Sequence, residues 1–302
     1  MKKSIKNLTA CVSGASGFIG SHLVKILQAN NIEVFSLKRD DLNNPVNLEV
    51  FMKDFKPDYI FHLASYGNHY DQKDEDETLT ANVIKTYFML KACKNLDFKA
   101  FVNFSSSSVY GTKSSPMKED QFLGTDTFYG CTKVAGEYLV RAFAKKYKKP
   151  YINVRPFSVY GEGEKDNRFI PTVIKSLLER KTIKLAEEPV HDWIYVNDFL
   201  IALLKIIEHS KDFAGESINI GTGTQYSNKQ VVDILEKILD NKVKIKKVKF
   251  LRNYDSDMWV ADTMKLKLLG WSPQFTLEQG LAQVCKYYEN IKLEGSRRNK
   301  KN

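Results

Sequence analysis

In the first half of the chain, short apolar runs alternate with longer segments in which apolar residues recur at helical spacing. The short runs predict buried strands and the periodic segments predict helices. Strands alternating with helices are typical of βαβ units, a parallel sheet and right-handed crossovers. We expect strands at residues 8–13, 33–37, 59–63, 100–105 and 151–155, and helices at 20–30, 48–55, 77–94 and 129–147.

After Pro156 the pattern is less regular and contains neither a clear linker nor a repeat. It predicts an α/β protein in which a Rossmann-type doubly wound parallel sheet carries a smaller C-terminal substrate-binding domain. The dinucleotide-binding domain is expected over residues 1–160, with returning segments near 192–222. The interleaved substrate-binding domain is expected over 161–292. Residues 293–302 are polar and basic and are expected to be disordered.

Composition is ordinary for a soluble globular protein, with 302 residues, 43% apolar and 27% charged. No apolar run reaches the roughly 18 residues that cross a bilayer, so no membrane partner is expected. The basic N-terminus runs straight into a strand, unlike a secretory signal, which predicts a cytoplasmic protein. The four cysteines are scattered, and neither they nor the histidines have metal-ligand spacing. The sequence therefore predicts reduced thiols and no metal site.

The net charge of +10 is concentrated in a few segments, including a lysine run at residues 242–249. Those lysines alternate with Val243, Ile245 and Val248, which predicts a strand with one charged, exposed face. A basic edge strand discourages edge-to-edge association. We therefore expect no nucleic-acid partner, although the charge would attract an anionic small substrate.

Three glycines, Gly14, Gly17 and Gly20, lie between the first predicted strand and the first helix. Glycine allows a tight turn and close approach of the backbone to a pyrophosphate, whose charge the helix N-terminal amides then meet. A strand–turn–helix context makes this spacing indicative of a dinucleotide site. The expected contacts from this turn are Gly14, Ser16, Gly17, Phe18, Ile19 and Gly20.

The end of the second predicted strand indicates which dinucleotide binds. An acidic residue there usually holds the free ribose 2′-hydroxyl of NAD. Here the strand ends in Lys38 and Arg39, and two cations suit a 2′-phosphate, so NADP is favoured over NAD. In the alternative, both cations are solvated and Asp40 or Asp41 contacts the adenosine end. Asp41 and Leu42 are included among the expected cofactor contacts.

Tyr129 and Lys133 lie four residues apart, and so on one face of a predicted helix. A free tyrosine has a pKa of about 10, too high for an effective base at neutral pH. A nearby ammonium favours the tyrosinate. Tyr129 could then exchange a proton with a sugar hydroxyl during hydride transfer, and Lys133 could also hold the nicotinamide ribose. The fourth predicted strand ends in four serines, one of which could bridge the substrate oxygen and Tyr129.

With these features in place, the chain resembles the extended short-chain dehydrogenase/reductases. Several stretches resemble the nucleotide-sugar branch of that family: His62-Leu63-Ala64-Ser65, Asn82-Val83-Ile84-Lys85-Thr86, Arg155-Pro156-Phe157-Ser158-Val159-Tyr160-Gly161 and Asp192-Trp193-Ile194-Tyr195-Val196-Asn197-Asp198. The resemblance covers nearly the whole chain. It implies a NAD(P)-dependent enzyme that acts on a nucleotide-diphosphate sugar, and a homodimer formed through the helices near 77–94 and 129–147.

The resemblance also implies roles for individual residues. Ser106, three residues before Val-Tyr-Gly, matches the catalytic serine or threonine, beside Tyr129 and Lys133. Leu63, Ala64 and Ser65 are implied as further cofactor contacts. His191 stands where the family often has an arginine, which would weaken a phosphate contact or make it pH-dependent. The substrate contacts implied or expected are Tyr66, Ser107, Arg168, His191 and Arg252.

The two positions after Ser106 bear on the reaction. Similar 4,6-dehydratases place an Asp and a Glu there, whereas this chain has Ser107 and Ser108, which disfavours dehydration. With dehydration disfavoured, the expected reaction is hydride transfer at a sugar carbinol, at C4. A 4-ketoreductase or dehydrogenase that exchanges its cofactor is favoured over a 4-epimerase that retains it. A catalytically inactive dinucleotide-binding sensor or scaffold is disfavoured, because Ser106, Tyr129 and Lys133 are all present.

Overall fold

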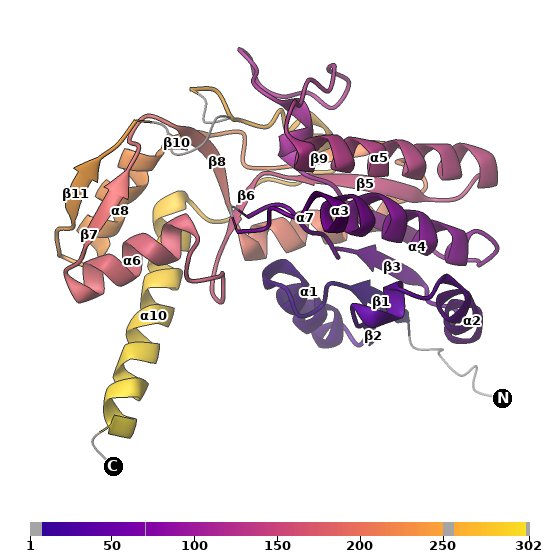
Figure 1. Cartoon of the computed structure of the whole chain (residues 1–302), viewed down its shortest axis with the longest axis horizontal. Helices are drawn as coiled ribbons and strands as arrows, with labels where there is room; N and C mark the ends of the chain where they lie inside the picture. The colour runs from indigo at the N-terminus through magenta and orange to yellow at the C-terminus, as the bar shows by residue number, and fades with distance from the viewer. Residues whose placement is uncertain (1–7, 70, 250–256, 300–302) are drawn as a thin grey trace.

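A six-stranded parallel sheet forms the centre of the larger lobe in the computed structural model, which describes residues 8–69, 71–249 and 257–299, with side chains to residue 293 (Figure 1). All neighbouring strands pair in parallel, in the order β2-β1-β3-β4-β5-β9. This confirms the predicted Rossmann-type sheet. The strands are β1 (Thr9–Ser13), β2 (Glu33–Leu37), β3 (Tyr59–His62), β4 (Ala100–Phe104), β5 (Tyr151–Pro156) and β9 (Ser217–Ile220).

Helices cover both faces of the sheet, because its central strands are apolar on both sides; all five residues of β4 are buried. One face carries α1 (Phe18–Ala29) and α7 (Val196–Glu208), and the other carries α2 (Pro45–Phe55), α4 (Lys85–Cys93) and α5 (Phe128–Tyr147) (Figure 1). The core beneath α1 and α7 continues into the smaller lobe. The two lobes therefore share buried apolar side chains.

The segment expected to form one helix over residues 77–94 is interrupted. It consists of α3 (Glu75–Leu79), a π-helical turn η2 (Thr80–Ile84) and α4. Asp74 begins it by accepting a hydrogen bond from the backbone N–H of Glu77 at 2.9 Å. π-Turns often occur at functional sites. Here the turn contains Asn82, whose side chain is buried beside the candidate active site.

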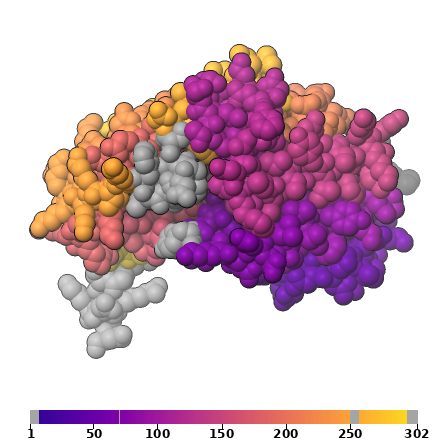
Figure 2. Space-filling model, turned by 45° about the horizontal axis from the view of Figure 1, so that its top comes forward, coloured from indigo at the N-terminus to yellow at the C-terminus, as the bar shows by residue number. Residues whose placement is uncertain are grey.

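The smaller lobe contains the two-stranded parallel sheet β7–β11 (Figure 1). Its elements are α6 (Phe169–Glu179), β7 (Thr182–Leu185), α8 (Asn228–Ile238), β11 (Lys244–Lys247) and α10 (Leu277–Asn299). The lysine run does form a strand with exposed lysines, whereas its partner β7 was not predicted. Helix α10 continues past residue 293, where composition predicted a disordered tail. The β7–β11 sheet lies at the end of the molecule away from the N-terminal half (Figure 2).

A three-stranded sheet connects the lobes. It contains β6 (Ser158–Tyr160), β8 (Val190–Tyr195) and β10 (Gln225–Ser227), and helix α9 (Met264–Leu268) follows further along the chain. Asp192 of β8 is fully buried and accepts hydrogen bonds from the backbone N–H groups of Thr222, Gly223 and Ala261 at 2.7, 2.9 and 3.1 Å. Asp192 thus holds three chain segments together. The position where β1 is flanked by β2 and β3 is a topological switch point, at which ligands of such sheets bind.

Candidate active site

The glycine turn between β1 and α1 fits an anionic diphosphate. A Cβ on Gly20 would lie 2.1 Å from the carbonyl oxygen of Gly14. Helix α1 can therefore approach the turn this closely only because residue 20 is glycine. Gly17 is the N-cap of α1, no side chain caps the helix, and its first turn contains no acid. A Cβ on Gly14 would lie 2.8 Å from the Ala64 amide nitrogen. The predicted contacts at 14–20 and 63–65 therefore lie together, beside helix amides available to a phosphate.

The turn after β2 is held by polar contacts at the surface. A carboxylate oxygen of Asp41 accepts a hydrogen bond from the backbone N–H of Lys38 at 2.7 Å. Arg39 is 68% exposed and its guanidinium lies 2.5 Å from a carboxylate oxygen of Glu77 on α3. Leu42, a predicted cofactor contact, is instead buried in the core. Arg39 thus has an acidic partner that the sequence did not reveal.

Helix α5 places Lys133 beside Tyr129, as the spacing of four residues predicts. The helix begins at Phe128 and is capped by the Thr127 hydroxyl, which accepts from the N–H of Gly130 at 3.1 Å. The Lys133 ammonium donates to the carbonyl oxygen of Phe104 at 2.8 Å and lies 5.8 Å from the centre of the Tyr129 ring. Burial lowers the pKa of Lys133 to about 8. This arrangement puts a cation next to a half-buried phenol.

Asn82, part of one of the family-like motifs, connects the loop after β3 to helix α5. Its amide accepts from the N–H of Tyr66 at 3.1 Å and donates to the carbonyl of Tyr66 at 2.9 Å. The same amide nitrogen donates to the Thr132 hydroxyl at 2.9 Å, and that hydroxyl donates to the carbonyl of Tyr129 at 2.8 Å. Asn82 therefore fixes the backbone of Tyr66 relative to that of Tyr129.

Gly67 brings this loop against the ring of Tyr129. Its backbone φ is +95°, a conformation that other residues rarely adopt. A Cβ at this position would lie 2.7 Å from the methyl of Thr78 and 3.3 Å from Cδ2 of Tyr129. The loop can therefore pack this closely on Tyr129 only because residue 67 is glycine.

His62, at the end of β3, is a buried neutral residue beneath these groups. Its Nδ1 lies 2.7 Å from the Ser13 hydroxyl, and its Nε2 lies 3.1 Å from the Thr86 hydroxyl. The Thr86 hydroxyl donates to the carbonyl of Asn82, so it accepts from Nε2–H of His62. Burial, together with the charge of Lys133, lowers the pKa of His62 to about 3. His62 therefore joins β1, β3 and α4 without carrying a charge.

The serine turn, residues 105–111, follows β4 and contains the 3₁₀ helix η3 (Ser107–Tyr110). Ser106 is its half-buried N-cap; the hydroxyl accepts from the N–H of Ser108 and donates to the Ser108 hydroxyl, both at 3.1 Å. Ser107 is buried, and its hydroxyl accepts from Nε1 of Trp259 at 3.2 Å. Ser107, a predicted substrate contact, is thus occupied by a protein partner from far along the chain.

The remaining predicted substrate contacts come from both lobes. Arg168, the N-cap residue of α6, donates to the carbonyl of Asn68 at 3.3 Å, in the loop that also contains Tyr66. His191 is half-buried on β8, with its ring 5.2 Å from that of Trp193. Arg252 lies outside the described residues. The structure therefore brings Arg168 to the loop of Tyr66, from the opposite lobe.

Other family-like residues form a buried network that supports the serine turn. Arg155 makes paired hydrogen bonds with the carboxylate of Glu137 at 2.8 and 2.7 Å. Arg155 also donates to the Tyr110 hydroxyl at 2.8 Å, and that hydroxyl donates to the side-chain oxygen of Asn219 at 2.7 Å. Sequence reasoning did not predict these contacts. They join the last residue of η3 to β5, β9 and α5.

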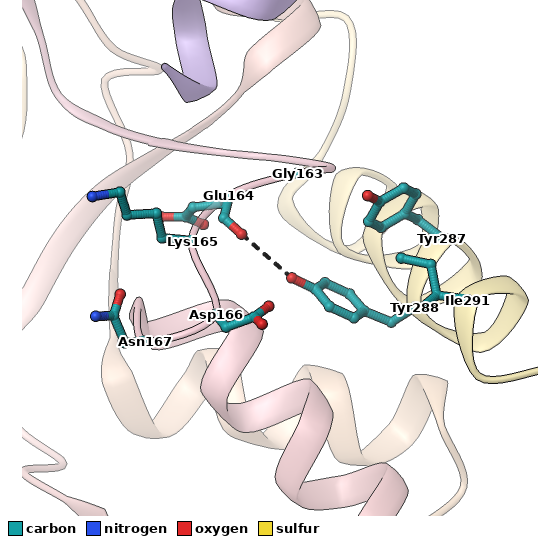
Figure 3. Close-up of a pocket in the computed structure, with 8 residues that line it drawn as sticks. All are labelled: Gly163, Glu164, Lys165, Asp166, Asn167, Tyr287, Tyr288 and Ile291. Carbon is teal, nitrogen blue, oxygen red and sulfur yellow. Dashed lines mark hydrogen bonds between the residues drawn. The ribbon is translucent and has the colours of Figure 1, made fainter. Parts of the chain in front are cut away.

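A hollow of about 530 Å³ lies elsewhere, between residues 163–167 and helix α10 (Figure 3). Tyr288 donates to the carbonyl of Glu164 there at 3.5 Å, with Tyr287 and Ile291 alongside. Burial raises the pKa of the Glu164 carboxyl to about 8. None of the predicted catalytic residues lines this hollow. Within the described part of the chain, no cluster of three potential metal ligands occurs, and no helix is long and apolar enough to span a membrane.

A parallel sheet with a glycine turn at its switch point and a Tyr–Lys pair at the same edge defines a dinucleotide-dependent enzyme of the Rossmann class. The chain matches the model of the NAD dependent epimerase/dehydratase family over residues 10–221. It belongs to that family, as the sequence resemblance predicted. It is therefore an enzyme of the class formed by nucleotide-sugar epimerases, dehydratases and dehydrogenases.

Characterised and uncharacterised relatives align over nearly their whole length. A GDP-6-deoxy-D-talose 4-dehydrogenase from Aggregatibacter actinomycetemcomitans is 29% identical, covering 94% of this chain and 98% of its own. An uncharacterised UDP-glucose epimerase, YtcB, from Bacillus subtilis is also 29% identical, covering 93% and 98%. The UDP-glucuronic acid 4-epimerase of Bacillus cereus, solved with UDP-glucuronic acid and NAD, superposes with a TM-score of 0.85 at 28% identity, covering 94% and 100%. The 4-dehydrogenase and the 4-epimerase carry out different reactions.

Proposed function

We propose that this chain is a NAD(P)-dependent 4-ketoreductase, or the reverse dehydrogenase, of a nucleotide-diphosphate sugar. The observation that supports this proposal most strongly is the set of side chains in the serine turn and their hydrogen bonds. Ser108 is bonded to Ser106, Ser107 is bonded to Trp259, and the turn contains no carboxyl group. Eliminating water would need a further acid and base beside Ser106. The arrangement supports a reaction that moves one hydride and one proton at a single carbon.

In the proposed mechanism, the glycine turn at residues 14–20 and Lys133 would hold the dinucleotide, which would supply hydride chemistry at C4 of the sugar. Ser106 donates a hydrogen bond to the C4 oxygen and so orients it toward Tyr129. During reduction, the Tyr129 hydroxyl gives its proton to that oxygen, which converts the ketone to an alcohol. The Lys133 ammonium stabilises the tyrosinate that is left. Dehydrogenation reverses each transfer.

The residues that bind the substrate and the cofactor are also part of the proposal. Arg168, His191 and Arg252 would bind the nucleotide diphosphate, and Tyr66 would contact the sugar. The cofactor proposed is NADP, with Lys38 and Arg39 at its 2′-phosphate. The exposed guanidinium of Arg39 supports this assignment, since a phosphate can replace Glu77 as its partner. Solved relatives contain NAD, which is the competing assignment.

A second candidate is a nucleotide-sugar 4-epimerase that retains its cofactor. The similarity to the UDP-glucuronic acid 4-epimerase favours it. The same Ser106, Tyr129 and Lys133 would serve, with the keto-sugar turning over between two hydride transfers. For either reaction we propose a homodimer formed through residues 77–94 and helix α5. These segments expose Ile84 of η2, Tyr87 of α4 and Tyr138 of α5.

One experiment separates the two reactions. The purified protein is incubated with NADPH or NADH and an enzymatically prepared dTDP- or GDP-4-keto-6-deoxy sugar, and separately with UDP-glucose and UDP-glucuronic acid. Reduced nicotinamide is followed by absorbance and sugars by NMR. Stoichiometric consumption of NADPH with a 4-keto sugar supports the reductase. Interconversion of UDP-sugars without consumption rejects it in favour of the epimerase, and no turnover with any of them rejects both.

A further inference from the structure

We propose that Trp259 is a positioning residue for catalysis, which holds the catalytic serine turn through its hydrogen bond to Ser107. The inference rests on the proposed function of Ser106. The Trp259 ring is 7% exposed and Ser107 is 6% exposed, and the bond between them joins residues 152 positions apart in the chain. A buried polar contact at that separation has to be built by the tertiary fold.

The turn that Trp259 holds has little stability of its own. Helix η3 is four residues long, and a 3₁₀ helix of this length has weak internal hydrogen bonds. The backbone bond that closes it, from Val109 N–H to Ser106 carbonyl, measures 3.3 Å. The position of the Ser106 hydroxyl therefore depends on contacts from outside the turn.

Those outside contacts hold the two ends of η3. Its last residue, Tyr110, is fixed by Asn219 and Arg155 at 2.7 and 2.8 Å. Its first residue, Ser107, is fixed by Trp259. On one side of Ser106, the N–H of Ser105 donates to the carbonyl of Val154 at 2.8 Å. On the other side, the Trp259 bond to Ser107 is the side-chain contact from outside the turn that lies nearest in the chain to the catalytic hydroxyl. Loss of that bond would leave Ser105 and Tyr110 held and would remove the side-chain contact that holds Ser107 between them.

Trp259 is itself rigidly placed, as a positioning residue must be. Its backbone N–H donates to the side-chain oxygen of Gln225 at 2.9 Å. The carbonyl of Val260 accepts from Met117 at 2.9 Å, and the N–H of Ala261 donates to the buried carboxylate of Asp192 at 3.1 Å. Residues 259–261 thus connect the inter-lobe sheet, which holds them through Gln225 and Asp192, to the serine turn.

The chain offers a matched control for removing the indole N–H. Trp271 is 5% exposed, and its Nε1 is buried without a hydrogen-bond partner among the described residues. Trp259→Phe and Trp271→Phe therefore delete the same atoms from buried sites, but only the first breaks a hydrogen bond. Ser107→Ala removes the acceptor while leaving Trp259 in place.

We expect Trp259→Phe and Ser107→Ala each to lower kcat about tenfold with KM changed less than about twofold, because the reacting groups are displaced while binding is kept. The double variant should be no slower than either single variant, since both remove one bond. Trp271→Phe should keep kcat within about twofold. Melting temperatures are measured for all four variants, so that a folding defect is recognised.

Three results would overturn the inference: unchanged kcat in Trp259→Phe, an equal loss in Trp271→Phe, or additive losses in the double variant. A rise in KM with unchanged kcat would instead make Trp259 a substrate contact. A readout independent of turnover is the ¹⁵N–¹H spectrum of the three indoles. Ser107→Ala should shift the Trp259 indole peak, even if the proposed reaction is wrong; an unshifted peak would reject the bond itself.

Discussion

The serine turn and the Lys38–Arg39 turn lie at the same edge of the sheet, after β4 and β2, yet they are held in opposite ways. The serine turn is fixed by buried hydrogen bonds from Trp259, Asn219 and Arg155. The Lys38–Arg39 turn is held by one carboxylate of its own and by an exposed ion pair with Glu77. In the proposed function, the rigid turn carries the chemistry and the adaptable turn selects the dinucleotide.

The energetic consequences differ accordingly. Leaving a buried polar group without its partner costs about 1–3 kcal/mol. An exposed ion pair contributes only about 0–1 kcal/mol. Changes around the serine turn and α5 should therefore abolish or strongly reduce the reaction. Changes at the Lys38–Arg39 turn should alter cofactor preference while the reaction persists.

The largest effect is expected at Tyr129. Tyr129→Phe removes the hydroxyl that exchanges the proton, and kcat should fall about 10²–10⁴-fold. Cofactor binding, measured by fluorescence titration with NADPH, should be nearly unchanged. Tyr147→Phe is the control, because Tyr147 is the last residue of the same helix and lies far along it from Tyr129. Full activity of Tyr129→Phe would contradict the assignment of the proton donor.

The close packing of the loop after β3 gives the next prediction. Gly67→Ala places a methyl 2.7 Å from Thr78 and 3.3 Å from the Tyr129 ring, so Thr78 must shift and the ring must give by a few tenths of an ångström. A displacement on the order of 1 Å can reduce kcat about 10²-fold, so this smaller shift should reduce kcat about tenfold. Gly270→Ala is the control: Gly270 also has a positive φ, of +71°, but nothing lies within 4 Å of its added Cβ. If both variants lose only thermal stability, the packing on Tyr129 is irrelevant to turnover.

A pH profile tests the buried charge beside Tyr129. Burial lowers the pKa of Lys133 to about 8. In the proposed mechanism its ammonium is the active form. Raising the pH through about 8 removes that charge, so kcat/KM for keto-sugar reduction should fall about tenfold per unit above this value. Glu164 also has a pKa near 8, so Glu164→Gln serves as the control. If Glu164→Gln no longer loses activity above pH 8, the alkaline limb of the profile belongs to Glu164 and not to Lys133.

The sequence predicted the features that depend on short separations. Each strand, the glycine turn and the Tyr129–Lys133 spacing are formed by residues close together in the chain. At such short separations, periodicity and turn chemistry determine the geometry. The sequence did not predict contacts between distant segments. Trp259 and Ser107 are 152 residues apart, and Arg39 and Glu77 are 38 apart, so no local pattern relates them.

The π-turn shows the same limit at shorter range. Residues 77–94 have helical periodicity throughout, and nothing in that pattern marks an interruption at Thr80–Ile84. The interruption accompanies the contacts of the Asn82 side chain with Tyr66 and Thr132, which come from two other elements. Tertiary hydrogen bonding, rather than local propensity, decides the structure there.

The smallest effects are expected at the Lys38–Arg39 turn. Arg39→Ala should raise the KM for NADPH about tenfold and leave that for NADH nearly unchanged, because a charge-assisted contact to the 2′-phosphate is lost. Glu77→Gln should act in the opposite direction and lower the KM for NADPH about twofold, since an exposed ion pair worth at most about 1 kcal/mol no longer competes. Glu75→Gln, on the same helix turn, controls for the general change in charge. If Arg39→Ala affects NADPH and NADH equally, the guanidinium does not distinguish the two cofactors and the NADP proposal is wrong. If kcat with the preferred cofactor also falls, the two turns are coupled, and the separation of chemistry from cofactor selection does not hold.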